Sequence, residues 1–124
     1  DGARPLVTPE VFARCIEAAR SCGAATAAVP VKDTIKLADE VGPVLDTPDR
    51  SRLWAVQTPQ IFDRERYLRA AEEAERQGLS CTDDCQLFEA MGWEVQLVMG
   101  DYRNLKLTTP EDFLAAGAYL EGIK

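Results

Sequence analysis

The stretch TPEVFARCIEAARSCGAATAAVP, residues 8–30, decides how this chain folds. Thr8 suits the N-cap of a helix, Pro9 suits its first position, and the apolar residues that follow recur at helical spacing. Gly23 is typical of a helix end. A run of small, mostly apolar residues at 24–29 follows at once and predicts a buried strand. A helix that leads directly into a buried strand is a unit of layered α/β domains.

Similar start and stop signals mark further elements downstream. Because helices and strands alternate along the chain, the predicted fold class is α/β. The patterns predict a helix over 62–77, a short helix between a Thr82-Asp83-Asp84 cap and Gly92, strands over 93–99 and 104–107, and a last helix from Pro110 whose apolar face is Phe113, Ala116 and Leu120.

Residues 31–56 have a different character. Short extended pieces are predicted at 34–37, 44–45 and 53–57, with turn clusters between them and few apolar residues per unit of length. A lone hairpin is only marginally stable in water. This arm must therefore pack against another surface to be stable, and a second subunit is one candidate for that surface.

The composition limits the possible functions. The 124 residues suffice for one domain, and their net charge of −7 disfavours non-specific nucleic-acid or anionic-membrane binding. No apolar run is long enough for a transmembrane helix, and the lack of histidine excludes histidine-based catalysis and metal ligation. The cysteines do not have zinc-ribbon spacing, and we expect reduced thiols of a cytoplasmic protein at Cys15, Cys22, Cys81 and Cys85.

Polar residues near the predicted strand ends are candidates for a ligand site, because α/β sheets bind ligands there. Cations in these places can hold a phosphate, and a carboxylate such as Asp1 can hold Mg²⁺ alongside substrate phosphates. Taken alone, any one of them is more simply explained as a solvated surface charge or a cap. The candidate cations are Arg4, Lys32, Lys36, Arg50, Arg52 and Lys106.

Most of these residues fall within recognisable blocks of sequence. The blocks are Asp1-Gly2-Ala3-Arg4-Pro5, Pro30-Val31-Lys32-Asp33-Thr34-Ile35-Lys36, Asp49-Arg50, Leu53-Trp54-Ala55-Val56-Gln57-Thr58-Pro59-Gln60, Thr82-Asp83-Asp84 and Asn104-Leu105-Lys106-Leu107-Thr108-Thr109-Pro110-Glu111-Asp112. Each block is weak alone. As an ordered set over essentially all 124 residues, they resemble the C-terminal half of the 2-C-methyl-D-erythritol 4-phosphate cytidylyltransferases of the non-mevalonate isoprenoid pathway.

The resemblance implies a Rossmann-like nucleotidyltransferase sheet, incomplete in this chain, with an extended β-arm that embraces the second subunit of a homodimer. It implies transfer of CMP from CTP to methylerythritol phosphate, with Mg²⁺ and release of pyrophosphate. The family's acceptor-binding residues correspond to Asp1, Arg4 and Lys106 of one subunit and to Thr34 and Arg50 of the other.

The implied roles follow from the repulsion between the acceptor phosphate and the α-phosphate of CTP. Lys106 would lie between the two phosphates as a point charge, and Arg50 would grip the acceptor phosphate; these two are the expected catalytic residues. Arg4 would assist Arg50, and Thr34 would donate a hydroxyl. Asp1 would orient sugar hydroxyls or help to hold the metal.

The chain departs from the family in one respect. The family's Gly-rich CTP-binding loop precedes the block at Asp1, and these residues do not include it. We therefore expect residues 1–124 to be the C-terminal part of a cytidylyltransferase domain, nearly inactive alone. Two alternatives stay open: a cytidylyltransferase for another polyol phosphate such as ribitol 5-phosphate, and a non-catalytic dimerisation module. Lys36 after Asp33-Thr34-Ile35 favours the methylerythritol enzyme.

Overall fold

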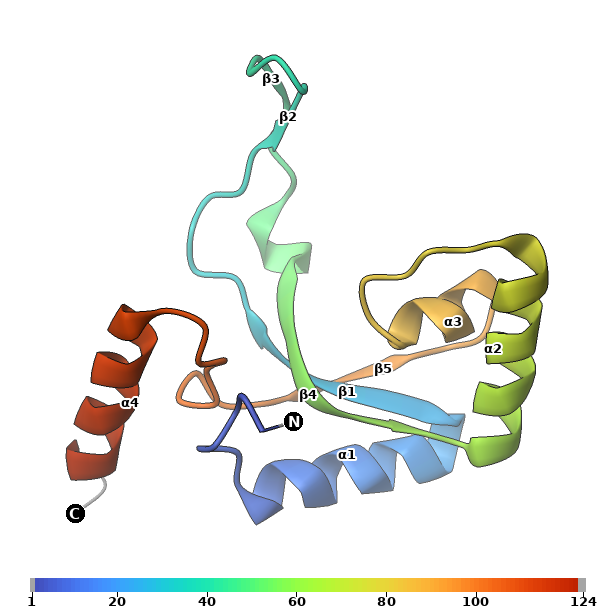
Figure 1. The fold of residues 1–124 in the computed structure, drawn as a ribbon, viewed down its shortest axis with the longest axis horizontal. Helices are drawn as coiled ribbons and strands as arrows, with labels where there is room; N and C mark the ends of the chain where they lie inside the picture. The colour runs from blue at the N-terminus through green and yellow to red at the C-terminus, as the bar shows by residue number, and fades with distance from the viewer. Residues whose placement is uncertain (1, 123–124) are drawn as a thin grey trace.

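The computed structural model describes residues 2–122, and its centre is a three-stranded sheet in the order β4-β1-β5 (Figure 1). β1 (Ala24–Pro30) pairs antiparallel with β4 (Trp54–Phe62) and parallel with β5 (Gln96–Met99). The predicted α/β class is confirmed. The helices of this domain are α1 (Pro9–Cys22), α2 (Arg64–Gln77), α3 (Cys85–Ala90) and α4 (Pro110–Gly122).

The small residues of β1 let helices approach both of its faces. On one face, Ala27 packs with Val11 and Cys15 of α1. On the other face, Ala24 packs with Phe88 of α3 and with alanines of α2. Successive side chains of a strand point to opposite faces, so a strand covered on both sides is apolar throughout. The predicted buried strand is therefore the middle of the core.

Local caps set the helix ends, as the sequence predicts. The Thr8 hydroxyl accepts a hydrogen bond from the Val11 amide at 3.4 Å, and α1 ends where Gly23 adopts a φ of 96°. α2 begins two residues later than predicted, because Phe62 is the last residue of β4 and Asp63 precedes the helix. The Asp63 carboxylate accepts from the Arg66 amide at 3.0 Å and is the N-cap.

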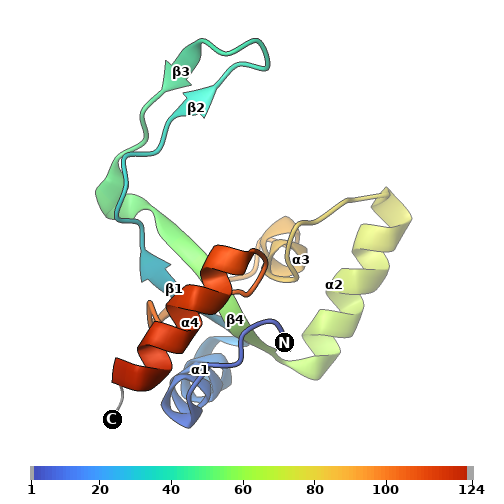
Figure 2. The same ribbon diagram turned by 60° about the vertical axis from the view of Figure 1, so that its left-hand side comes forward.

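The arm projects from the rest of the molecule in both views (Figures 1 and 2). Its strands are β2 (Leu37–Ala38) and β3 (Val44–Asp46), an antiparallel pair, so the extended piece expected at 34–37 begins only at its last residue. The piece expected at 53–57 is the first part of β4, which continues to Phe62 in the main sheet. The arm also exposes large apolar side chains at Ile35, Leu37, Val41, Val44 and Leu45.

Two predicted strands are wrong in extent or kind. The strand expected over 93–99 begins only at Gln96, because the Trp93 ring packs edge-on against Phe88 with centroids 5.3 Å apart and belongs to the helical core. The segment 104–107 is not a strand. Its Leu107 amide donates to the Ala3 carbonyl at 2.7 Å, and the Asn104 side chain is fully buried. Tertiary contacts therefore override the extended pattern there.

The last helix buries less than its periodicity predicts. Ala116 is the buried residue of α4 in the described chain, whereas Phe113 and Leu120 of the expected apolar face are 64% and 57% exposed. This residue pattern forms an apolar face that residues 2–122 do not cover.

The cysteines are free thiols, as predicted. Cys15 and Cys85 are buried, and desolvation raises the pKa of both, that of Cys85 to about 12. These two thiols stay protonated at neutral pH and act as small core residues. Among the helices of residues 2–122, none is long and apolar enough to cross a bilayer.

Candidate functional site

A cavity of about 490 Å³ brings together residues from distant parts of the sequence. Arg4 comes from the N-terminal segment and Lys106 from the segment after β5, and both line this cavity. The remaining lining side chains belong to β4 and to the region from the α2–α3 loop into α3. They are Val56, Gln57, Thr58, Gln60, Thr82, Asp83, Gln86 and Glu89.

The Arg4 side chain is held by the segment that carries Lys106. Its Nη1 donates to the Asn104 carbonyl at 2.7 Å, and the neighbouring Ala3 carbonyl accepts from the Leu107 amide at 2.7 Å. Partial burial lowers the pKa of the Arg4 guanidinium, which remains charged at neutral pH because an arginine does not deprotonate in proteins. The two hydrogen bonds join the two segments that contribute these cations to the cavity wall.

A buried amide network supports this wall. The Asn104 Nδ2 donates to the Gln57 Oε1 at 3.2 Å and to the Thr58 carbonyl at 2.8 Å. The Gln57 Nε2 donates in turn to the Asp101 carbonyl at 2.9 Å. A Cβ at position 100 would collide with the Gln57 Oε1, so Gly100 leaves room for this side chain. The network joins β4 to the segment 100–106.

Sequence reasoning missed Gln57 and Asn104 as supporting residues of the site. Both side chains are almost fully buried, at 6% and 0% exposure. The available signal was an asparagine placed in an expected strand, where this residue type is depleted.

Carboxylates also line the cavity. The Asp83 side chain accepts from the Gln60 Nε2 at 3.2 Å and from the Gln86 amide at 3.2 Å, and Glu89 also lines the cavity. The cations can bind phosphate, and the carboxylates can accept hydrogen bonds from hydroxyl groups. The cavity therefore offers groups for both kinds of contact.

The other expected site residues lie elsewhere. Thr34 is exposed in the arm, and Arg50 is exposed in the 3₁₀ turn η1 (Arg50–Arg52). The Arg50 Nη1 donates to the Lys32 carbonyl at 2.8 Å. Neither residue lines the cavity of Arg4 and Lys106 within one chain. Asp1, the expected metal-binding residue, lies outside the described residues.

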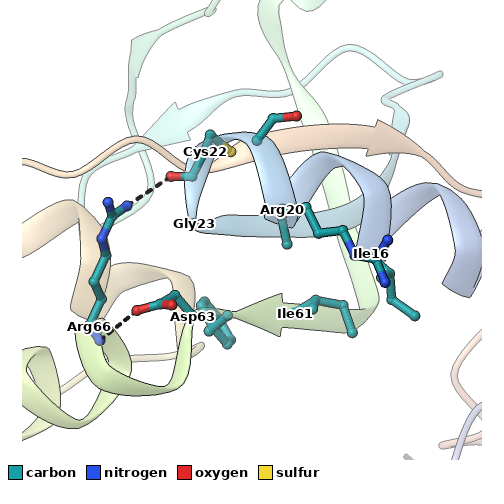
Figure 3. A pocket seen from close by; sticks show the side chains of 10 residues that line it. Ile16, Arg20, Cys22, Gly23, Ile61, Asp63 and Arg66 are labelled. Atoms are coloured by element: carbon teal, nitrogen blue, oxygen red, sulfur yellow. Dashed lines mark hydrogen bonds between the residues drawn. The ribbon is translucent and has the colours of Figure 1, made fainter.

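A second cavity, of about 300 Å³, lies where α1 ends and α2 begins (Figure 3). The Arg66 guanidinium spans its edge and donates to the Cys22 carbonyl at 3.2 Å, while Asp63 caps α2. Arg66 and Asp63 are engaged in closing helix ends, and none of the expected site residues lines this cavity. The cavity of Arg4 and Lys106 is therefore the candidate site.

Comparison with known proteins agrees with the fold. A family model described as 2-C-methyl-D-erythritol 4-phosphate cytidylyltransferase matches residues 1–122. The chain belongs to this family.

Relatives in this family are similar over nearly the whole chain. The 2-C-methyl-D-erythritol 4-phosphate cytidylyltransferase of Desulforamulus reducens is 53% identical over 121 residues, which are 98% of this chain and 52% of that protein. The enzyme of the same name from Caldanaerobacter subterraneus is 54% identical over 120 residues, 97% of this chain and 53% of that protein. The chain thus spans about half the length of these relatives.

Solved structures of the family have the same fold. The 4-diphosphocytidyl-2C-methyl-D-erythritol synthase of Anaerococcus prevotii superposes with a TM-score of 0.89 at 39% identity, covering 98% of this chain and 56% of the other. The cytidylyltransferase of Thermus thermophilus gives a TM-score of 0.84 at 37% identity, covering 96% and 58%. The architecture expected from the resemblance, a nucleotidyltransferase fold of which this chain forms part, is confirmed.

Proposed function

We propose that this chain is the C-terminal, acceptor-binding part of a cytidylyltransferase that transfers CMP from CTP to 2-C-methyl-D-erythritol 4-phosphate. The observation that carries the proposal is the convergence of Arg4 and Lys106 on one cavity, from opposite ends of the described chain. Membership in the family supports the reaction type and the acceptor. The half-length match supports a CTP-binding portion outside these residues.

The proposed chemistry is an in-line displacement at phosphorus. An oxygen of the acceptor phosphate attacks the α-phosphorus of CTP, and the bond from that phosphorus to the bridging oxygen breaks, so pyrophosphate leaves with the bonding electron pair. Two anions must approach each other in this step. Lys106 offsets their repulsion, and Arg4 holds the acceptor in line.

A divalent cation fits this arrangement. Mg²⁺ is commonly held by one or two carboxylates together with substrate phosphates, which requires no preformed protein cage. Among residues 2–122, no group of three or more acidic or cysteine side chains could hold a metal ion. Following the family resemblance, we assign the metal contact to Asp1 together with the substrate phosphates; the ion would neutralise charge on the triphosphate. Thr82, Asp83 and Glu89 are left to face the acceptor's hydroxyl groups.

We also propose that Thr34 and Arg50 act on the cavity of a second copy of the chain. Both are exposed on or at the base of a projecting arm whose apolar residues are open to solvent. An arm of this kind needs a surface to cover those residues. A homodimer in which each arm reaches the other copy would cover them and complete two equivalent sites.

The direct test is pyrophosphate release by the full-length protein. With CTP and Mg²⁺, we expect release to depend on methylerythritol phosphate and to be at least about 100-fold slower with ribitol 5-phosphate. Ribitol 5-phosphate is linear and carries one more hydroxyl group, and a site built to hydrogen-bond one polyol leaves polar groups unpaired with the other. Equal rates with ribitol 5-phosphate would contradict the assigned acceptor. Residues 1–124 alone, assayed alongside, are expected to release almost none.

The shared site predicts complementation between two inactive variants. In a mixture of Arg50→Ala and Lys106→Ala chains, each mixed dimer retains one site that has both residues. After random exchange of subunits we expect about a quarter of the unmutated rate, because half of the dimers are mixed. Sedimentation must show that each variant remains a dimer. A rate no higher than the sum of the two separate variants would mean that Arg50 does not act across the dimer.

A further inference from the structure

The root of the arm is held by few backbone interactions. The two passes of the chain are joined by a hydrogen bond from the Val31 amide to the Leu53 carbonyl at 3.1 Å and by the pairing of Pro30 with Trp54. Beyond this point the two passes are joined by the short β2–β3 pair, by the backbone hydrogen bonds of the turn at its end, and by a hydrogen bond from the Lys36 Nζ to the Thr47 hydroxyl at 2.9 Å. The direction in which the arm leaves the domain therefore depends on what holds residues 30–32.

One side chain from a different part of the sequence holds that root. The Tyr102 hydroxyl donates to the Pro30 carbonyl at 2.7 Å. The ammonium group of Lys32 lies over the Tyr102 ring, 3.9 Å from its centroid. Lys32 in turn accepts, through its carbonyl, the hydrogen bond from Arg50 Nη1. Tyr102 thus contacts Pro30 and Lys32, two of the three root residues, and Lys32 connects it to Arg50.

Tyr102 belongs to the same short segment as the groups that build the cavity wall. Asp101, immediately before it, accepts from Gln57 through its carbonyl, and its carboxylate accepts from the Arg103 amide at 2.8 Å. Asn104, two residues after it, binds Arg4 and β4, and Lys106 follows. The segment 100–106 therefore touches the arm with one side chain and the cavity with others.

We propose that Tyr102 is a positioning residue that clamps the arm root to the segment carrying Lys106. The clamp fixes the place at which the arm presents Thr34 and Arg50 to the second copy; this consequence rests on the proposed function. Loss of the hydroxyl removes one hydrogen bond, and loss of the ring also removes the cation–π contact with Lys32.

Three variants of the full-length protein test the clamp. Tyr102→Phe keeps the ring beneath Lys32 and loses only the hydroxyl, whereas Tyr102→Ala loses both contacts. Tyr119→Ala is the matched control, because Tyr119 lies on α4 and has a similar exposure of 36% against 41% for Tyr102. Each variant is examined by hydrogen exchange at two amides of the root: that of Val31, which donates to the Leu53 carbonyl, and that of Leu53, which donates to the Arg50 carbonyl. Steady-state kinetics are measured with each substrate varied in turn.

We expect Tyr102→Ala to speed exchange of the two root amides by about 5- to 20-fold and Tyr102→Phe to speed it less. We expect the KM for the acceptor phosphate to rise by about 10-fold in Tyr102→Ala while the KM for CTP stays unchanged, because only the acceptor uses the arm residues. Unchanged exchange, or equal effects in Tyr119→Ala, would overturn the clamp. Faster exchange with an unchanged acceptor KM would overturn its positioning role. If the unmutated protein transfers no CMP to methylerythritol phosphate, the proposed function fails, and the exchange rates still decide the clamp.

Discussion

Lys106→Ala in the full-length protein is expected to lower the rate of CMP transfer by a factor of about 10²–10³ without changing the free energy of unfolding. The size of the effect reflects the loss of a fixed charge at the point where two anions are forced together. The free energy of unfolding should not change because the Lys106 side chain is exposed on the cavity wall. Single-turnover rates and urea midpoints measure the two quantities separately.

Two further variants separate a local charge from the overall charge of the protein. Lys106→Arg keeps the charge but replaces a compact ammonium by a planar fork, so we expect it to recover part of the lost rate. Arg69→Ala removes one positive charge from an exposed position on α2, away from the cavity, and should leave the rate unchanged. A Lys106→Ala enzyme with near-normal turnover would remove the role assigned to this residue.

Asn104→Ala is expected to destabilise the protein by about 2–4 kcal/mol. Asn104 is completely buried, and its amide group is the donor to both the Gln57 side chain and the Thr58 carbonyl. Truncation removes this donor from both acceptors, and a buried group that loses its hydrogen-bond partner, such as the nearly fully buried Gln57 side chain, costs about 1–3 kcal/mol. Because the Asn104 segment also holds Arg4, the acceptor KM should rise as well.

Asn104→Asp tests whether the amide donor of Asn104 or the volume of its side chain stabilises the protein. The aspartate has the same size but places oxygen atoms against two other oxygens, so we expect it to be at least as destabilising as alanine at neutral pH. Gln96→Ala is the control, since Gln96 is an exposed amide whose side chain donates only to the neighbouring Leu97 carbonyl. The donor role would be contradicted if Asn104→Asp had a higher urea midpoint than Asn104→Ala, close to that of the unmutated protein.

The elements that could be predicted are those whose signals are local. The Thr8 cap, the Gly23 stop and the small residues after it lie next to the structures they specify, and α1 and β1 follow the prediction closely. Gly78 likewise ends α2 with a φ of 67°. The family resemblance added the expected partners of Arg4, which no spacing rule provides.

The incorrect structural predictions have a common cause. Asn104–Leu107 has the pattern of a strand, but its hydrogen-bonding partners are Arg4, Gln57 and Ala3, all of which are remote in the sequence. Phe113 and Leu120 have the period of a packed helix face, yet within residues 2–122 they remain largely exposed. A periodic pattern indicates that a helix has an apolar face, but it does not indicate which part of the protein covers that face.

The chain's residues alone were enough to specify its helices, its central buried strand and a projecting arm, because caps, glycines and apolar spacing act within one or two turns of the backbone. Only the folded chain brought Arg4 beside the Lys106 segment and placed Tyr102 under the arm root. Those contacts join residues 100 and 72 positions apart, and such pairings depend on how whole elements pack rather than on any local preference.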